Sequence, residues 1–296
     1  MTAAREIAPG LRLLCAPNPS PMTGPGTNTY MVGRGQVAVI DPGPDLPAHL
    51  DAILGALGPD ERVSHILVTH AHLDHAGLAR GLSKRTGAPV LAFGNWTSGR
   101  SPLMQNLAEA GIGGGEGVDA SFVPDRCLGD GEEISGPGWV LRALWTPGHF
   151  GNHICLQWGD EIFTGDLVMG WASSLISPPD GDMGAYMASL SRIMSLGPRR
   201  LWPGHGDAVD DPAFRLAELV AHRRSRERAI LAAVLAAGPA GATPAELRQR
   251  VYGSDLAPAL FTAAERNVLA HLIDLHERGL VACHPAPHPE ARFHRP

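Results

Sequence analysis

The residues with the clearest chemistry lie between Thr69 and Gly77, where three imidazoles and one carboxylate fall within six positions: His70, His72, Asp74 and His75. Imidazole and carboxylate groups are common ligands of divalent metals. The apolar run at 66–68 predicts a strand, and side chains two apart in an extended chain project to the same side, so His70 and His72 can converge on one ion. Asp74 and His75 lie where the chain enters a predicted helix and can reach a second point. The spacing therefore indicates two neighbouring metals.

Each of these residues alone also has an ordinary interpretation. His70 could be a histidine at a strand end, and Asp74 could be the N-cap of the following helix. Three further candidate ligands favour the metal site, because each follows a predicted strand in a turn that contains glycine: His149, Asp166 and His205. Ligands held on loops at the edge of a rigid sheet follow this pattern.

The arrangement resembles the metallo-β-lactamase superfamily, and specifically its glyoxalase-II-like hydrolase branch. The resemblance implies an α+β fold, an αββα sandwich of two mixed sheets with helices outside. It also implies two metal sites and a bridging ligand: His70, His72 and His149 for the first metal, Asp74, His75 and His205 for the second, and Asp166 between them. Asp74 and Asp166 would also hold the attacking water as catalytic residues.

Departures from related families narrow the expected chemistry. True zinc β-lactamases have a cysteine where Asp166 stands, and diiron flavoproteins of this fold have an acidic residue where His72 stands. We therefore expect a compact dinuclear hydrolase that uses a hydroxide bridging two divalent metal ions. Zinc is favoured by the histidine-rich ligands, and iron or manganese would suit the same set.

Residues outside the ligand set are predicted to support it or to meet the substrate. Asp41 ends the predicted strand 36–40, where the family has an aspartate behind the metal site. The resemblance implies that Asp41 orients a ligand imidazole through the second ring nitrogen, and a turn or N-cap role is the alternative. The predicted substrate-binding residues are Asn28 and, in the loop 168–179, Trp171, Ser173 and Ser174. The alternative interpretation of the segment around Asn28 is a plain turn.

Composition bounds the class of protein. The chain has 296 residues, of which 44% are hydrophobic and 18% charged, as in ordinary globular proteins, and it can form one large and one small domain. No apolar stretch is long enough to span a membrane, and the first residues lack a signal-peptide pattern, so we expect a cytoplasmic protein without a membrane span. The four cysteines are widely spaced, which indicates neither a disulfide framework nor a thiolate zinc site.

The character of the chain changes near residue 212. Residues 1–212 carry 13 basic and 22 acidic side chains, a net charge of −9, whereas residues 213–296 carry 11 and 8, a net charge of +3. We predict a catalytic domain over 1–212 and a winged-helix-like domain over 213–296. Capping-box patterns begin at Thr243 and Thr262, and Gly279 is predicted to end the last helix before a short hairpin. This module resembles the one that follows the metal domain in a β-lactamase-like subfamily that includes a mitochondrial endoribonuclease.

The expected partner is a small ester or thioester substrate, or single-stranded RNA. Four arginines on the first helix of the second domain could bind a phosphate backbone and therefore favour RNA as the substrate: Arg223, Arg224, Arg226 and Arg228. The negative charge of the first domain opposes a long polyanion. A packing module, with a homodimer as one possibility, is the other interpretation of the second domain. The alternative function is a winged-helix nucleic-acid-binding regulator whose metal site is structural or vestigial.

Overall fold

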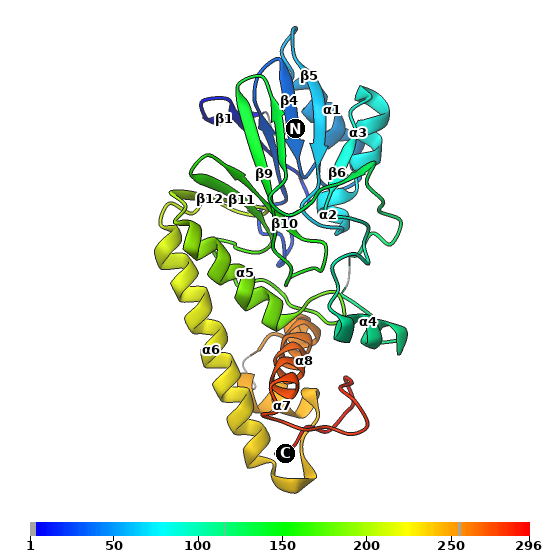
Figure 1. The fold of residues 1–296 in the computed structure, drawn as a ribbon, viewed down its shortest axis with the longest axis vertical. Coiled ribbons are helices and arrows are strands. Elements are labelled where there is room, and N and C mark those ends of the chain that lie inside the picture. Colours follow the sequence, from blue (N-terminus) through cyan, green and yellow to red (C-terminus); the bar gives the residue numbers. More distant parts are fainter. Residues whose placement is uncertain (1–3, 116, 254–255) are drawn as a thin grey trace.

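The computed structural model describes residues 4–115, 117–253 and 256–296. Two β-sheets pack face to face with helices on their outer sides, and a group of helices extends from one end of this sandwich (Figure 1). The first sheet has seven strands, in the order β1-β2-β3-β4-β5-β6-β7, and the second has five, in the order β12-β11-β10-β9-β8. Both sheets are mixed, because β4 to β7 run parallel and β11 runs parallel to β12. The predicted αββα sandwich is confirmed.

The strands of the first sheet are β1 (Arg5–Ala8), β2 (Leu11–Cys15), β3 (Asn28–Val32), β4 (Gln36–Ile40), β5 (Arg62–Leu67), β6 (Val90–Ala92) and β7 (Arg126–Cys127). Those of the second are β8 (Glu133–Gly136), β9 (Trp139–Trp145), β10 (Ile154–Trp158), β11 (Glu161–Gly165) and β12 (Arg200–Pro203). Apolar side chains from both sheets, including Leu67, Leu141 and Phe163, form the buried layer between them. Burial of this layer removes a large apolar area from water and fixes the strand ends that carry the candidate ligands.

Helices cover the outer faces of the sheets. On the first sheet lie α1 (Pro47–Gly55), the short α2 (Leu73–Ala76) and α3 (Ala79–Thr86), and on the second lies α5 (Met183–Leu196). Asp182 caps α5 by accepting a hydrogen bond from the Ala185 N–H, and Gly197 ends it at a positive φ of 58°. Both ends follow the helix-capping preferences of these residues. The sequence pattern did not reveal α4 (Pro102–Glu109).

The second domain contains α6 (Pro212–Ala236), α7 (Pro244–Tyr252) and α8 (Phe261–Glu277), with the short 3-10 helices η1 (Gly238–Ala240) and η2 (Pro258–Leu260). The capping box at Thr243 is confirmed. The one at Thr262 is wrong, because η2 leads directly into α8 at Phe261 and places Thr262 inside the helix. In the described residues the predicted terminal hairpin is reduced to isolated antiparallel bridges, Ala242 with Phe293 and Ala282 with His294.

The two predicted domains share hydrophobic clusters. Leu216 and Leu219 of α6 pack in the cluster that contains Tyr186 of α5. Met104 and Leu107 of α4 belong to the cluster of the helical module. Because side chains from both sides of residue 212 share these clusters, the domain boundary at 212 stays a prediction. The start of α6 at Pro212 agrees with it. Within the described part of the chain, no helix has both the length and the apolar character needed to cross a membrane.

Candidate metal centre

The structure brings the seven predicted ligands together from four places in the fold. The segment after β5 supplies four of them, the turn between β9 and β10 supplies His149, and the ends of β11 and β12 supply Asp166 and His205. They form three overlapping groups in which all ligand atoms lie within 4.8 Å of one another: His70, His72 and His149; His70, His75 and Asp166; and Asp74, His75 and His205. Loops far apart in the sequence thus meet at one place.

The first group presents three ring nitrogens to one point. Nδ1 of His72 lies 2.9 Å from Nε2 of His70 and 3.1 Å from Nε2 of His149. The second group is equally compact, because Oδ2 of Asp74 lies 3.3 Å from Nε2 of His205 and 3.5 Å from Nε2 of His75. Each group therefore has the three protein ligands of an open catalytic metal site.

Asp166 faces both groups. Its Oδ1 lies 3.4 Å from Nε2 of His75 and 3.4 Å from Nε2 of His205, whereas its Oδ2 lies 3.8 Å from Nε2 of His149. Oδ1 is buried and makes no hydrogen bond of good geometry, so its polar neighbours are these two rings. A buried carboxylate is costly in a folded protein unless positive charge lies beside it, and a bound cation would supply that charge. The donor set therefore fits two divalent cations, with the bridging role of Asp166 as a prediction.

Hydrogen bonds behind the rings fix which nitrogen faces the centre. The contacts join Nδ1 of His75 to Asp41 Oδ2 at 2.8 Å, Nδ1 of His149 to the Leu175 carbonyl at 2.7 Å, and Nδ1 of His205 to the Gly26 carbonyl at 3.2 Å. Since these oxygens only accept, each Nδ1 carries the hydrogen and donates it. In the neutral ring that a metal requires, each Nε2 then has its lone pair directed at the centre.

Asp41 is held in an unusual backbone conformation. Its φ is +48°, and among the described residues it is the one non-glycine residue with a positive φ. Its carboxylate accepts hydrogen bonds from the Thr69 N–H and hydroxyl, both at 2.8 Å, as well as from His75. Aspartate tolerates this region better than most residues, and such strain concentrates at functional sites. The geometry matches the predicted orienting role, which remains a proposal.

The electrostatics of the centre leave two of its histidines charged when metal-free. Burial lowers the pKa of His70 well below its usual range and that of His72 to about 3. Burial opposes charge at His75 and His205 too, but the neighbouring carboxylates of Asp74 and Asp166 prevail. They raise the pKa of His75 well above its usual value and that of His205 to about 9. The carboxylates thus attract positive charge to the place where cations would bind.

One supporting histidine was missed in the sequence. His153 is fully buried, and burial lowers its pKa to about 3, so the ring is neutral. Its Nδ1 lies 3.0 Å from the Thr146 hydroxyl, and its Nε2 accepts a hydrogen bond from the Asp166 N–H at 3.3 Å. This contact fixes the backbone at Asp166. Its position four residues after the candidate ligand His149 is the feature of the sequence that could have indicated a role near the centre.

The predicted substrate residues separate into two kinds. Asn28 is 3% exposed, and its amide donates to the carbonyls of Pro203 and Gly206, so it holds the His205 loop. Ser174 is buried, and its hydroxyl donates to the carbonyls of Asp166 and Leu167. These contacts give both side chains a supporting position. Ser173 is partly exposed and Trp171 exposed, so their contact with substrate stays a prediction.

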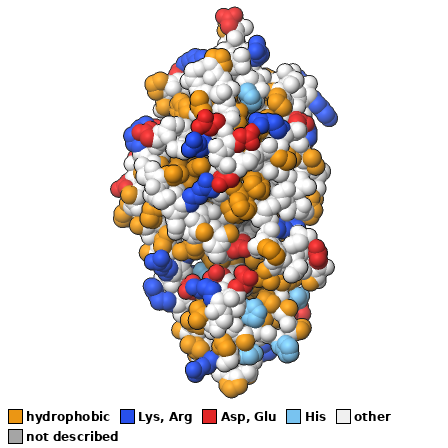
Figure 2. Space-filling model, viewed as in Figure 1, with side chains coloured by type: hydrophobic (Ala, Val, Ile, Leu, Met, Phe, Trp, Pro, Cys, Tyr) orange, Lys and Arg blue, Asp and Glu red, His pale blue; other side chains and the backbone are white. Residues whose placement is uncertain are grey.

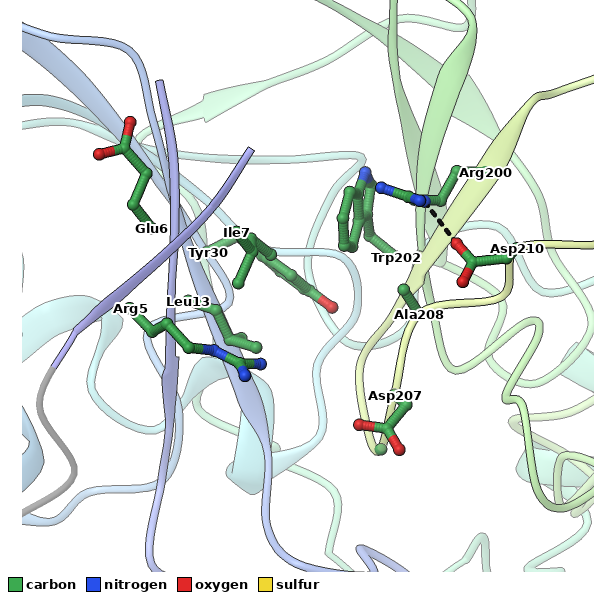
Figure 3. Close-up of a pocket in the computed structure, with 11 residues that line it drawn as sticks. Arg5, Glu6, Ile7, Leu13, Tyr30, Arg200, Trp202, Asp207, Ala208 and Asp210 are labelled. Atoms are coloured by element: carbon green, nitrogen blue, oxygen red, sulfur yellow. Dashed lines mark hydrogen bonds and ion pairs between the residues drawn. The ribbon is translucent and has the colours of Figure 1, made fainter. Parts of the chain in front are cut away.

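A cavity of about 460 Å³ lies between β1 and β12 (Figure 3). Tyr30 and Trp202 form part of its wall, and the Tyr30 hydroxyl donates to the Pro203 carbonyl at 2.7 Å. Figure 3 shows Arg200 paired with Asp210 at one side and Arg5 on the opposite strand. The described residues that line it include none of the seven ligands, so this cavity lies behind the His205 loop.

Comparison with known proteins identifies the family of both parts. Residues 22–205 match the metallo-beta-lactamase superfamily, and residues 243–286 match the beta-lactamase associated winged helix domain. The chain is 35% identical over 222 residues to the lactamase-like protein nscB of Neosartorya fischeri, a match that covers 74% of this chain and 60% of that one. The chain thus spans less than two thirds of this relative.

Two further proteins are similar over more of their length. The atrochrysone carboxyl ACP thioesterase of Aspergillus fumigatus is 29% identical over 282 residues, covering 89% of this chain and 81% of that one. The crystal structure of a metallo-beta-lactamase family protein from Thermus thermophilus matches with a TM-score of 0.76 and 27% identity, covering 98% of this chain and all of that one. The chain, with its cluster of candidate histidine and aspartate ligands, belongs to the metallo-beta-lactamase superfamily and carries a β-lactamase-associated winged helix domain.

Proposed function

We propose that the protein hydrolyses a thioester, or a related ester, of a small and largely apolar acyl group. The observation that carries this proposal is the apolar surface beside the accessible side of the metal centre. The similarity to a protein named as an acyl-carrier-protein thioesterase supports the same reaction class.

The centre is accessible at Asp74, whose side chain is 26% exposed, whereas those of His75 and His205 are almost fully buried. Leu73 lies directly before Asp74 in the sequence and is 49% exposed. Leu73 lies between two candidate ligands in the sequence, at the start of α2, and its exposed side chain is available to a substrate. It is well placed to contact an apolar group whose reacting carbonyl lies at the centre.

Trp171 and Met22 are two further exposed apolar side chains on segments that contact the centre. A Cβ placed on Gly206 would lie 2.8 Å from Trp171, and one on Gly24 would lie 3.5 Å from it. The exposed indole therefore packs beside the backbone next to His205. Met22, also exposed, belongs to the same loop as Gly24, and Thr27 of this loop donates to Asp74 Oδ2 at 3.2 Å. We name Met22, Leu73 and Trp171 the apolar rim.

Charge supports an acyl substrate over RNA. Of the four arginines on α6 that favoured a phosphate backbone, Arg223 is buried and Arg226 stacks 4.3 Å from the ring centre of Tyr252. Only Arg224 and Arg228 of this group are exposed. On the face drawn in Figure 2, basic side chains lie among acidic ones. Such a surface gives weak attraction for a polyanion.

The regulator alternative is also poorly supported. In a winged helix that reads DNA, one helix must enter the major groove. Residues Val268 to Ile273 of α8 are all buried, and this run covers the full circumference of the helix. As placed here, α8 is not free to enter a groove.

The protein's own residues explain how the reaction would proceed. Two bound divalent cations would supply a water of lowered pKa and would polarise the substrate carbonyl. Nearby histidines keep the pKa of the Asp74 carboxyl below its usual range despite burial, so Asp74 is ionised at neutral pH and can accept the proton of the attacking water. Thr27 orients this carboxylate. The apolar rim would bind the acyl group and exclude water from it.

We further propose zinc as the metal, since most of the predicted ligands are imidazoles, with iron or manganese as alternatives that the same donors accept. A small-molecule substrate and a cytoplasmic location complete the proposal. The cytoplasmic location rests on the cysteine pattern, which indicates no disulfide framework.

The deciding experiment compares substrates on one preparation. The protein reconstituted with Zn²⁺ is assayed with acyl-thioesters of increasing chain length, with a lactone and with a short single-stranded RNA, beside a His72→Ala variant. We expect thioester turnover that His72→Ala abolishes. RNA cleavage lost in His72→Ala, with no thioester or lactone turnover, would overturn the proposed substrate class.

The apolar rim is tested by matched substitutions. Leu73→Ala and Met22→Ala should raise KM for a long acyl chain by about 5–10-fold, as expected for about 1 kcal/mol of lost apolar contact. Leu196→Ala and Met194→Ala are the controls, since these exposed side chains of the same types lie at the end of α5. Equal effects in both pairs would remove the rim from substrate binding.

A further inference from the structure

The C-terminal helices hold a long loop that lies against the metal centre. This loop, residues 168–179, connects the Asp166 turn with α5, and we name it the strap. Arg215 of α6 donates to the carbonyls of Met169 and Ala172, at 2.8 and 2.6 Å. Arg266 of α8 donates to the Pro178 carbonyl at 3.3 Å. The strap is thus bound by the second domain at both of its ends.

The middle of the strap is held by two more side chains of that domain. Arg223 donates through Nη2 to the Ser174 carbonyl and through Nη1 to Oδ1 of Asn267 at 3.2 Å. The same Oδ1 accepts the Ile176 N–H at 3.1 Å. Arg223 and Asn267 therefore fix the backbone on either side of Leu175.

Leu175 and Ser174 in turn contact two of the metal ligands. The Leu175 carbonyl accepts the Nδ1 hydrogen of His149 at 2.7 Å, which sets both the tautomer and the orientation of that ring. The Ser174 hydroxyl donates to the Asp166 carbonyl at 2.5 Å. The path from the C-terminal domain to the centre is a short chain of directed hydrogen bonds.

The burial of Arg223 argues that its role is specific. The residue is 2% exposed, and among the described residues no carboxylate pairs with it. Its guanidinium instead meets two oxygens and lies 5.1 Å from the ring centre of Tyr186. Burying a charge costs several kcal/mol unless directed contacts compensate it, so an apolar residue would serve plain packing better.

We propose that Arg223 and Asn267 are positioning residues, through which the winged-helix domain orients His149 and Asp166 by way of the strap. This assignment rests on the metal centre and not on the proposed substrate. It also predicts that the two metal sites respond differently. His75 and His205 are oriented from within the sandwich, by Asp41 and by the Gly26 carbonyl. Loosening the strap should therefore affect the metal held by His70, His72 and His149 first.

The test measures metal binding to the full chain. Arg223→Met and Asn267→Leu are titrated with Zn²⁺ against a chromophoric chelator. We expect the affinity of one of the two ions to fall by about 10–100-fold, which is the usual cost of losing a partner behind a ligand, while the affinity of the other, which shares only Asp166 with the strap, falls less. With Co²⁺, the visible absorption of one of the two ions should change.

Conservative and control variants separate positioning from general stability. Asn267→Asp keeps the accepting oxygen and should bind both Zn²⁺ ions with wild-type affinity. Ser174→Ala removes the hydrogen bond to the Asp166 carbonyl without altering the C-terminal helices. Arg224→Met, next to Arg223 but exposed, should bind both ions normally. If Arg223→Met does not fold, the comparison of Asn267→Leu with Asn267→Asp decides. Two ions bound with wild-type affinity by Asn267→Leu, or equal loss of both ions, would overturn the proposal.

Discussion

Replacing Asp41 with asparagine isolates the effect of one oxygen behind a ligand. Asparagine tolerates the positive φ of 48° about as well as aspartate, so the backbone need not move. Its carbonyl oxygen can still accept the Thr69 N–H, but the amide NH₂ would then face Nδ1 of His75, which now donates to Asp41. Two donors cannot pair. The ring would satisfy the contact by moving its hydrogen to Nε2, the atom that faces the centre.

The magnitude follows from that change of tautomer. A ring with hydrogen on Nε2 has no lone pair for a metal there, and loss of an orienting partner typically weakens metal binding by about 10–100-fold, which is about 1.4–2.8 kcal/mol. The ion held by Asp74, His75 and His205 should be the one affected. In Asp41→Ala the Thr69 N–H also loses its acceptor, so occupancy should fall further and stability with it.

The assay is Zn²⁺ titration of the folded Asp41→Asn protein, with turnover measured on the same samples. Glu161→Gln is the control, since Glu161 is also a buried carboxylate, bonded to Trp202 and Arg199, that touches no ligand. The control should keep both ions. Binding of two ions at wild-type affinity by Asp41→Asn would refute the inferred orientation of His75.

Three further outcomes are expected. Asp166→Ala should lower kcat to below about 1% of wild type and reduce Zn²⁺ occupancy, because both groups lose a shared ligand; an unchanged rate would contradict the bridge. The carboxylates overcome burial and raise the pKa of His205 to about 9, so Zn²⁺ must displace a proton from this ring. The affinity for Zn²⁺ should therefore fall as the pH is lowered from 9 to 6, and calorimetry in buffers of different ionisation enthalpy should detect the released protons. Zn²⁺ affinity that does not change with pH would contradict this. Thr243→Ala should lower the free energy of unfolding in urea by about 1 kcal/mol by removing a helix cap, whereas Thr262→Ala, where no cap forms, should not.

Local spacing determined much of this protein. The candidate ligands from His70 to His75 could be predicted because a strand end and a helix start impose known directions on nearby side chains. His149, Asp166 and His205 were readable because each ends an apolar strand at a turn. Periodicity predicted most of the strands, since each of these signals lies within a few residues of the element it describes, whereas the sandwich was implied by the resemblance to the family.

The partners of polar side chains were decided by the tertiary structure. Asn28 looked like a substrate residue, but its amide meets carbonyls 175 and 178 positions away. Arg223 looked like part of a basic surface, yet it is buried against Ser174. A sequence shows that such a group needs a partner when buried, whereas the packing of distant segments determines both its burial and its partner.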